Sequence, residues 1–176
     1  TELADEFVQA VPDATIAVFP AIVRTVEGTS YDPAAAERIA TFIRDNALGT
    51  GQTADLQFEP GEAEGVQFRL FKKSVEAIGK QRDDYAGDAD YLLVTEYLLT
   101  PTRSGGMAAG GIHCYILDRS GENAFSFLLN SHHKPFVDAG LRRPDQSTES
   151  RAWLVEQCTG VALEALKGQV ASANDQ

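Results

Sequence analysis

Three histidines are the residues of this chain whose type and spacing could hold a metal ion. His132 and His133 are adjacent, and neighbouring side chains of an extended segment point to opposite faces, so the two cannot easily share an ion. A metal site would also need carboxylate or cysteine ligands. His113 could approach His133 across a hairpin, with acids such as Asp118 or Glu96 beside it. Two interpretations stand: loop histidines without a ligand, and a metal-binding or small-molecule-binding enzyme.

The two cysteines permit three interpretations. Cys114 alternates with apolar residues of a predicted strand and Cys158 lies on the apolar face of a predicted helix, which is typical of small core residues. If that helix packs across that strand, the two could form a disulfide in an oxidising compartment. A reactive thiolate is the third interpretation, although nothing electropositive is adjacent and His113, which precedes Cys114, would lie on the opposite face of the strand. Zinc-ribbon and CxxC redox motifs are excluded, because neither cysteine has a second ligand at the required spacing.

Other motifs that could support catalysis are incomplete. The glycine-rich run at residues 104–111 (SGGMAAGG) lacks the Lys and Ser or Thr of a phosphate loop, and we expect a flexible hairpin tip there. Asp118, Ser120 and Gly121 have the composition of a tight hairpin turn. No serine has the surroundings of a nucleophile elbow. The sequence therefore predicts no catalytic residues and no cofactor.

The elements that must position these residues follow from hydrophobic periodicity. The secure one is a helix over residues 33–48, which begins with Asp32 as its cap and buries a stripe that includes Phe42 and Ala47. A second long helix over residues 62–82 would bury Val66 among others. Helices are also predicted at residues 1–11 and 148–170, and strands at residues 14–24, 54–58, 90–100, 111–119 and 123–131.

These elements predict one α+β domain over residues 1–176, with a single mixed sheet of about five strands and helices packed on it. The last three strands have short connections, which favours an antiparallel meander. Pro20 interrupts the first strand, because it cannot donate to a ladder. Residues 1–12 form either a short helix or a flexible arm, and residues 171–176 are expected to fray.

Charge and hydropathy exclude two classes of partner. The formal net charge is −11, and the basic residues form no localised patch, which argues against nucleic-acid binding. The sequence contains no apolar run of membrane-spanning length. The chain starts at Thr1 without a methionine or a signal-like segment, which indicates a processed form, and a signal or lipid anchor removed before Thr1 is compatible with that.

Three motifs carry a resemblance to a bacterial envelope family. They are an IAVF strand at residues 16–19, ADYLLVTEY at residues 89–97 and a DRSGE turn at residues 118–122. The pattern resembles the domain shared by the curli-secretion channel lipoprotein, the lipoprotein activators of penicillin-binding proteins and the amino-terminal domain of the Tol-system propeller protein. Thr95 stands where that family usually has Gly, and the lipidated cysteine is absent. The resemblance implies an accessory domain, periplasmic or outer-membrane associated, that works through protein contacts and has no catalytic residues.

The predicted partner surface lies in the polar segment at residues 132–146. It contains Phe136 and Leu141 beside Arg142 and Arg143, and an exposed aromatic beside arginines is typical of an interface anchor. The alternative is that Phe136 and Leu141 tuck under the loop as a small apolar cluster. The sequence thus favours a non-enzymatic binding or scaffold domain with a protein partner in the cell envelope. The alternative remains an enzyme that uses His113, His132 and His133.

Overall fold

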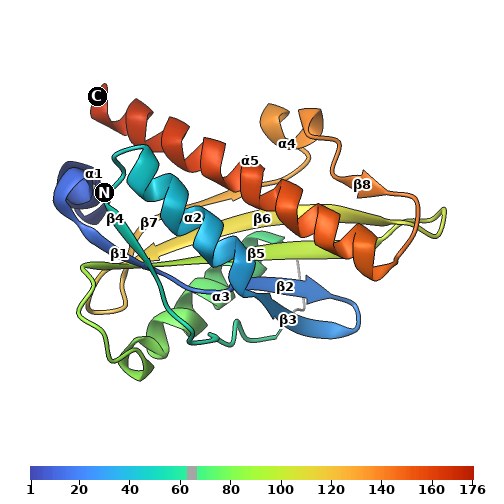
Figure 1. Cartoon of the computed structure of the whole chain (residues 1–176), viewed down its shortest axis with the longest axis horizontal. Helices are drawn as coiled ribbons and strands as arrows, with labels where there is room; N and C mark the ends of the chain where they lie inside the picture. The colour runs from blue at the N-terminus through green and yellow to red at the C-terminus, as the bar shows by residue number, and fades with distance from the viewer. Residues whose placement is uncertain (63–66) are drawn as a thin grey trace.

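The structure is a computed structural model that describes residues 1–62 and 67–176. The described residues form one eight-stranded mixed sheet with helices packed on both faces, so the predicted α+β class is confirmed (Figure 1). The helices are α1 (Glu2–Ala10), α2 (Pro33–Asp45), α3 (Gln67–Lys80), α4 (Lys134–Asp138) and α5 (Thr148–Asn174). The strands are β1 (Thr15–Val18), β2 (Ala21–Thr25), β3 (Gly28–Asp32), β4 (Thr50–Thr53), β5 (Tyr91–Pro101), β6 (Met107–Leu117), β7 (Asn123–Leu129) and β8 (Arg142–Arg143).

The long strands β5 and β6 form the centre of the sheet, and shorter strands lie end to end beside them. β1 pairs in parallel with residues 91–93 of β5, and β2 pairs in parallel with residues 96–98 of the same strand. Pro20 lies between β1 and β2, where no ladder donor is needed. β7 and β8 share the outer side of β6 in the same way. A sheet about five strands wide is therefore built from eight short and long pieces in the described chain.

Several strand boundaries differ from the predictions. The second strand was expected at residues 54–58, but β4 lies at Thr50–Thr53 and pairs in parallel with β1. Residues 28–32, which follow the predicted strand at residues 14–24, form the additional strand β3 in a hairpin with β2. The glycine-rich run was expected to be a hairpin tip, yet β6 already begins at Met107. Its small residues pair with β5 and, through Ala108, with β8, so long-range pairing overrides weak strand propensity.

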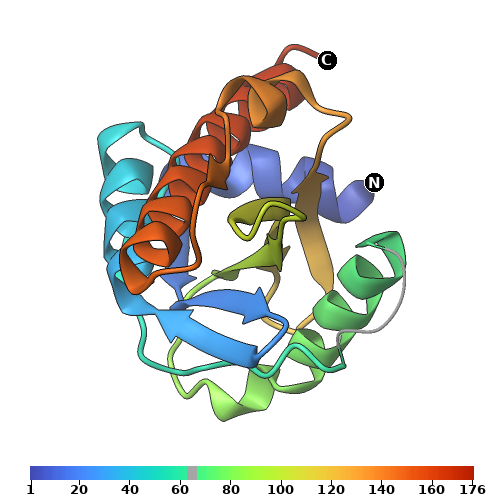
Figure 2. The same cartoon turned by 90° about the vertical axis from the view of Figure 1, so that its right-hand side faces the viewer.

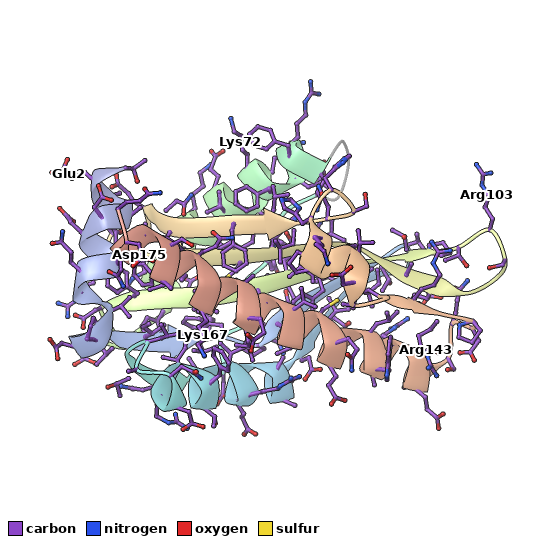
Figure 3. All side chains as sticks on the ribbon, turned by 90° about the horizontal axis from the view of Figure 1, so that it is seen from above. Glu2, Lys72, Arg103, Arg143, Lys167 and Asp175 are labelled. Carbon is purple, nitrogen blue, oxygen red and sulfur yellow. The ribbon has the colours of Figure 1, made fainter. Side chains whose placement is uncertain are left out.

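Two apolar layers separate the helices. One contains α1, α2 and α5 on one face of the sheet, with residues such as Phe7, Ile39 and Leu154 in its core. The other contains Ile78 of α3 on the opposite face, together with Leu92, which alternates along β5 with the residues of the first layer. Figure 2 and Figure 3 show α3 on the side of the sheet away from α2 and α5.

The observed helices begin close to the predicted residues, but several end at other residues than predicted. Thr1 caps α1, which packs on the sheet, so residues 1–12 begin with a helix and not with a flexible arm. Asp32 caps α2 as predicted, but Phe42 is only half-buried and Ala47 is exposed beyond the end of the helix. α5 continues to Asn174, so the helix includes residues 171–174, where the sequence predicts fraying.

Two further corrections concern the polar segments. The predicted helix at residues 62–82 corresponds to α3, with Glu62 outside the helix, and Val66 lies outside the described residues. The segment at residues 132–146 was expected to be a loop but contains α4 and β8. β8 pairs with the start of β6, which ties this segment to the central sheet.

Candidate functional site

The most elaborate polar cluster of the molecule lies between α3 and the sheet, and we call it the Glu96 cluster. Glu96 of β5 faces α3, and the sheet register places His113 of β6 directly opposite it. On the other side of β5, Glu96 is paired with Ile22 of β2, and Arg24 lies two residues further along that strand. Tyr115 and Ser74 complete the cluster. All five side chains are buried, with Glu96 and His113 at 0% exposure and Arg24 at 6%.

Glu96 is the acceptor at the centre of this cluster. Its Oε1 lies 2.8 Å from Nδ1 of His113 and accepts a hydrogen bond of 2.7 Å from the Tyr115 hydroxyl. Its Oε2 accepts from Nη1 of Arg24 at 3.1 Å and from the Ser74 hydroxyl at 3.0 Å. Both carboxylate oxygens therefore have two partners within the protein. Nη2 of Arg24 donates to the main-chain oxygen of Gly61 at 2.5 Å.

The electrostatics favour a charged Glu96. Burial raises the pKa of this carboxyl, but the hydrogen bond and charge of His113, the Tyr115 hydroxyl and the Arg24 guanidinium together lower it below its ordinary value. Burial and the charge of Glu96 raise the pKa of Tyr115, so the phenol stays protonated and donates. The cluster is thus a carboxylate held among donors in a region that is closed to solvent.

Gln67 of α3 joins His113 to the surface. Its Nε2 lies 3.2 Å from Nε2 of His113, and its Oε1 accepts from Nδ2 of Asn130 at 2.9 Å. The two ring nitrogens of His113 are therefore both engaged, Nδ1 by Glu96 and Nε2 by the amide of Gln67. A Cβ atom at Gly111 would lie 2.1 Å from Nε2 of Gln67. Glycine at this position is therefore what admits the glutamine side chain above the strand.

The structure does not bring the three histidines together. His132 is exposed, and Nδ1 of His133 lies 3.1 Å from Asn130 Oδ1 within their own turn. His133 is connected to His113 only through Asn130 and Gln67. Within residues 1–62 and 67–176, no group of three His, Cys, Asp or Glu side chains could hold a metal ion. The described geometry therefore offers no metal centre for the enzyme interpretation.

Arg24, Ser74 and Gln67 were missed by the sequence analysis. Glu96 and His113 were named there as possible neighbours, and the register confirms that they are paired. The available signal was a charged residue inside an apolar strand, because such a residue requires a partner when it is buried. Arg24 follows the apolar run of β2 and carries the same signal.

Both cysteines are free, buried thiols. Burial raises the pKa of Cys114 and of Cys158 to about 12 in each case. Of the three interpretations, small core residues is the one that the structure confirms, since both belong to the core between the sheet and α5. A thiol with so high a pKa is not a nucleophile at neutral pH.

The segment at residues 132–146 is less exposed than predicted. Phe136 is 7% exposed and Leu141 6% exposed, and both belong to the main core, so the expectation of an exposed aromatic is wrong for Phe136. Arg142 is exposed, whereas the guanidinium of Arg143 lies 5.1 Å from the Trp153 ring. The exposed apolar residue of this segment is Val137, at 58% exposure, which the sequence analysis did not single out.

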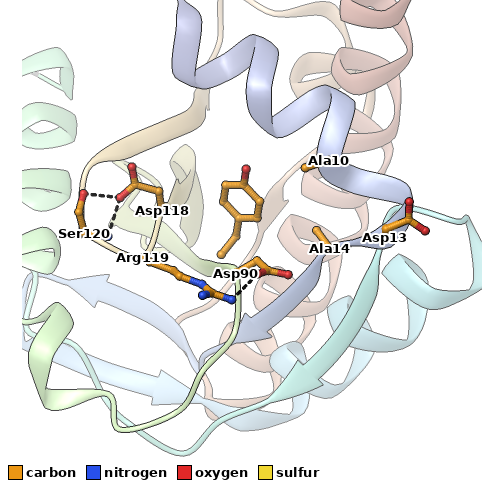
Figure 4. Close-up of a pocket in the computed structure, with 8 residues that line it drawn as sticks. Ala10, Asp13, Ala14, Asp90, Asp118, Arg119 and Ser120 are labelled. Atoms are coloured by element: carbon orange, nitrogen blue, oxygen red, sulfur yellow. Dashed lines mark hydrogen bonds and ion pairs between the residues drawn. The ribbon is translucent and has the colours of Figure 1, made fainter.

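An open cavity of 580 Å³ lies at the end of the sheet where β5 begins and β6 ends (Figure 4). Arg119 and Asp90 form an ion pair of 2.5 Å across it. Oδ2 of Asp90 also accepts from the main chain and hydroxyl of Thr15, and these hydrogen bonds lower its pKa despite partial burial. Asp118 accepts from Ser120, which confirms the predicted tight turn. Asp90 thus connects Thr15 at the start of β1 with Arg119, which follows the end of β6.

Comparisons with known proteins include a distant structural likeness. No protein-family model and no curated protein matches this chain. Among solved structures, the chain is similar to one described as the PelC dodecamer from Paraburkholderia phytofirmans. The sequence identity is 17%, the TM-score is 0.43, and the match covers 89% of this chain and 87% of that chain. Likeness at this level carries no argument about function, which is therefore argued from the residues of this chain.

None of the described helices is a candidate for a membrane-spanning segment. In the part of the chain that the structure describes, no helix has both the length and the apolar character needed to cross a bilayer.

Proposed function

We propose that this chain is a non-enzymatic binding or scaffold domain of the bacterial periplasm or outer envelope that acts through protein contacts. The observation that carries the proposal is that the Glu96 cluster is buried away from solvent. Its carboxylate has every oxygen engaged by protein donors, and Glu96 and His113 have no exposed surface. A general acid or base must reach the proton that it transfers, and in the described part of the chain Glu96 and His113 contact protein groups and have no surface open to a substrate.

The cluster has a structural role in this proposal. It connects β2, β5 and β6 to α3 through one carboxylate, and it replaces apolar packing at one end of the α3 layer. His113, one of the three histidines of the enzyme interpretation, belongs to this cluster. The cysteines support the same conclusion, because a pKa of about 12 leaves Cys114 and Cys158 protonated at neutral pH.

The envelope location rests on the resemblance of residues 16–19, 89–97 and 118–122. These motifs lie in β1, in and just before β5, and in the turn between β6 and β7. Their side chains build the core and the turn, which is what a domain family defined by a shared fold requires. The proposed partner is a protein, because the net charge of −11 disfavours nucleic acid and anionic lipid.

The partner surface predicted at Phe136, Leu141, Arg142 and Arg143 takes a different form in this proposal. Phe136 and Leu141 are buried and fix the segment on the core, so the exposed residues Val137 and Arg142 are left to make contacts. The binding role of this segment stays a prediction.

The first test of the proposal is photocrosslinking in the cells that naturally produce this protein. A photocrosslinking amino acid at Val137, compared with one at the equally exposed Phe68 on α3, should give a discrete crosslinked protein in the envelope fraction from Val137. Metal analysis of protein purified without a His tag is the second arm. Stoichiometric zinc, iron or manganese that is lost when His113 and His133 are replaced would overturn the proposal and support an enzyme.

A further inference from the structure

α2 and α5 lie side by side on the same face of the sheet (Figure 1, Figure 3). Residues of both helices line a groove. It consists of two hollows of 490 Å³ and 290 Å³ that share Ala34 and Arg38 in their linings. At the α5 side the lining includes Ala152 and Gly160. We call this feature the α2–α5 groove.

Small residues keep the groove open. Ala34, Ala152 and Gly160 have side chains too short to fill the space between the two helices. Arg38 lies across it, and its Nη1 donates to the main-chain oxygen of Glu156 at 2.8 Å. Phe42 is half-buried at the same groove and offers apolar surface there. Backbone of a third element could therefore approach both helices closely.

The rims of the groove are acidic on both sides. α2 contributes Glu37 and Asp45, and α5 contributes Glu156 and Glu164, all of them exposed. None of these four carboxylates forms an ion pair with another described residue. Arg38 is the one basic side chain in the lining, and it is engaged with a main-chain oxygen. The groove therefore presents an excess of negative charge, with these four carboxylates against the single guanidinium of Arg38 in its lining.

We propose that the α2–α5 groove is the docking site for a basic amphipathic helix of a partner protein. The inference rests on the proposed function and names the chemistry of the partner. α2 has 13 residues, which at 1.5 Å per residue gives a track of about 20 Å, or three to four helical turns. Lys and Arg on the flanks of such a helix would meet Glu37 and Glu164, and one apolar side chain would contact Phe42.

The probe for this inference is a synthetic 14-residue helix with leucines on one face and lysines on both flanks. Its affinity for the chain is measured by fluorescence anisotropy at low salt, beside a twin in which glutamate replaces every lysine. Glu37→Lys with Glu164→Lys reverses one charge on each rim. Asp83→Lys with Asp84→Lys makes the same change in net charge on the α3 side, at two exposed residues.

A second pair of variants blocks space without changing charge. Gly160→Trp places an indole in the groove, whereas Gly168→Trp places one on the same helix where no neighbouring atom lies within 4 Å of an added Cβ. Thermal unfolding establishes that each variant is folded. If Gly160→Trp fails to fold, the rim reversals still decide the question, because Glu37 and Glu164 are exposed.

We expect the lysine peptide to bind saturably and the glutamate twin not to bind. The rim reversal and Gly160→Trp should each weaken binding by about tenfold or more, and both controls should stay within about twofold, since two reversed pairs amount to roughly 1.4 kcal/mol. No binding, or equal weakening by Asp83→Lys with Asp84→Lys, would overturn the groove. Neither result touches the proposed function, which fails separately if metal analysis finds a histidine-bound ion.

Discussion

Replacing Glu96 by Gln removes the one negative charge inside the Glu96 cluster while it keeps the shape of the side chain. Arg24 is 6% exposed, and Glu96 is its ion-pair partner among residues 1–62 and 67–176; its other hydrogen bond goes to the main-chain oxygen of Gly61, which carries no charge. His113 and Tyr115 lose the strong acceptor and keep only an amide oxygen. The change therefore leaves a buried guanidinium uncompensated.

The magnitude follows from the geometry. Breaking a buried ion pair by removing one partner costs about 3–5 kcal/mol, and the Arg24–Glu96 pair is 3.1 Å long with side chains 7% and 0% exposed. We therefore expect Glu96→Gln to lower the free energy of unfolding by that amount, which is a large share of the roughly 5–15 kcal/mol available to a domain. The double variant with Arg24→Met should lose less than the sum of the two single variants, because neither charge is then left alone.

Urea unfolding measured by circular dichroism gives the free energy from the midpoint and the slope. Glu76→Gln is the matched control, because Glu76 pairs with Lys80 at the surface with side chains 69% and 73% exposed. That change should cost no more than about 0.5 kcal/mol. A loss below about 1 kcal/mol for Glu96→Gln, or strict additivity with Arg24→Met, would refute the view that the cluster stabilises the fold through its charges.

Three further results are expected. Because the folded pKa of Glu96 is lowered, its contribution to stability is complete above the ordinary glutamate pKa of about 4.3 and is lost as the pH falls through the lower folded value. The stability difference between the wild type and Glu96→Gln should therefore shrink below about pH 4; a difference that grows there would contradict this sign. Cys114 and Cys158, with pKa values of about 12, should react with Ellman's reagent only on unfolding, and rapid reaction of the native chain would place a thiol at the surface. Gly160→Ala and Gly168→Ala should each raise the free energy of unfolding by about 0.5–1 kcal/mol, since both are interior to α5 and at Gly160 an added Cβ meets only the flexible end of Arg38 at 3.2 Å. Destabilisation by Gly160→Ala alone would show that Arg38 cannot yield.

The sequence predicted those parts of the fold whose local pattern agrees with the tertiary structure. The β5–β6–β7 meander and the start of α2 at Asp32 were predictable, because strand alternation and a capping side chain are local signals. The strand at Met107 was not, because glycine and alanine have weak strand propensity and only pairing with β5 and β8 makes them extended. Phe42 was placed inward by periodicity alone, but it lines the hollow between α2 and α5 and is half-buried there.

Only part of the Glu96 cluster could be predicted from the sequence. A glutamate and a histidine inside apolar strands indicate a buried polar pair, and the pairing of Glu96 with His113 was within reach of the sequence. The contribution of Gln67 was not, because it depends on the absence of a side chain at Gly111, on a strand distant in sequence. Phe136 was misplaced at the surface because a polar neighbourhood in sequence does not reveal that α4 packs on the core.

The central claim is that the chain acts through protein contacts and that its buried titratable cluster serves only the fold. The most direct measurement is photocrosslinking from Val137 in cells that carry the Arg24→Met, Glu96→Gln double variant, once the variant is shown to be folded. We predict the same crosslinked protein and the same yield as in the wild type, because both replaced side chains lie inside the α3 layer. Loss of the crosslinked protein from a folded double variant would contradict the claim and give the Glu96 cluster a direct part in function.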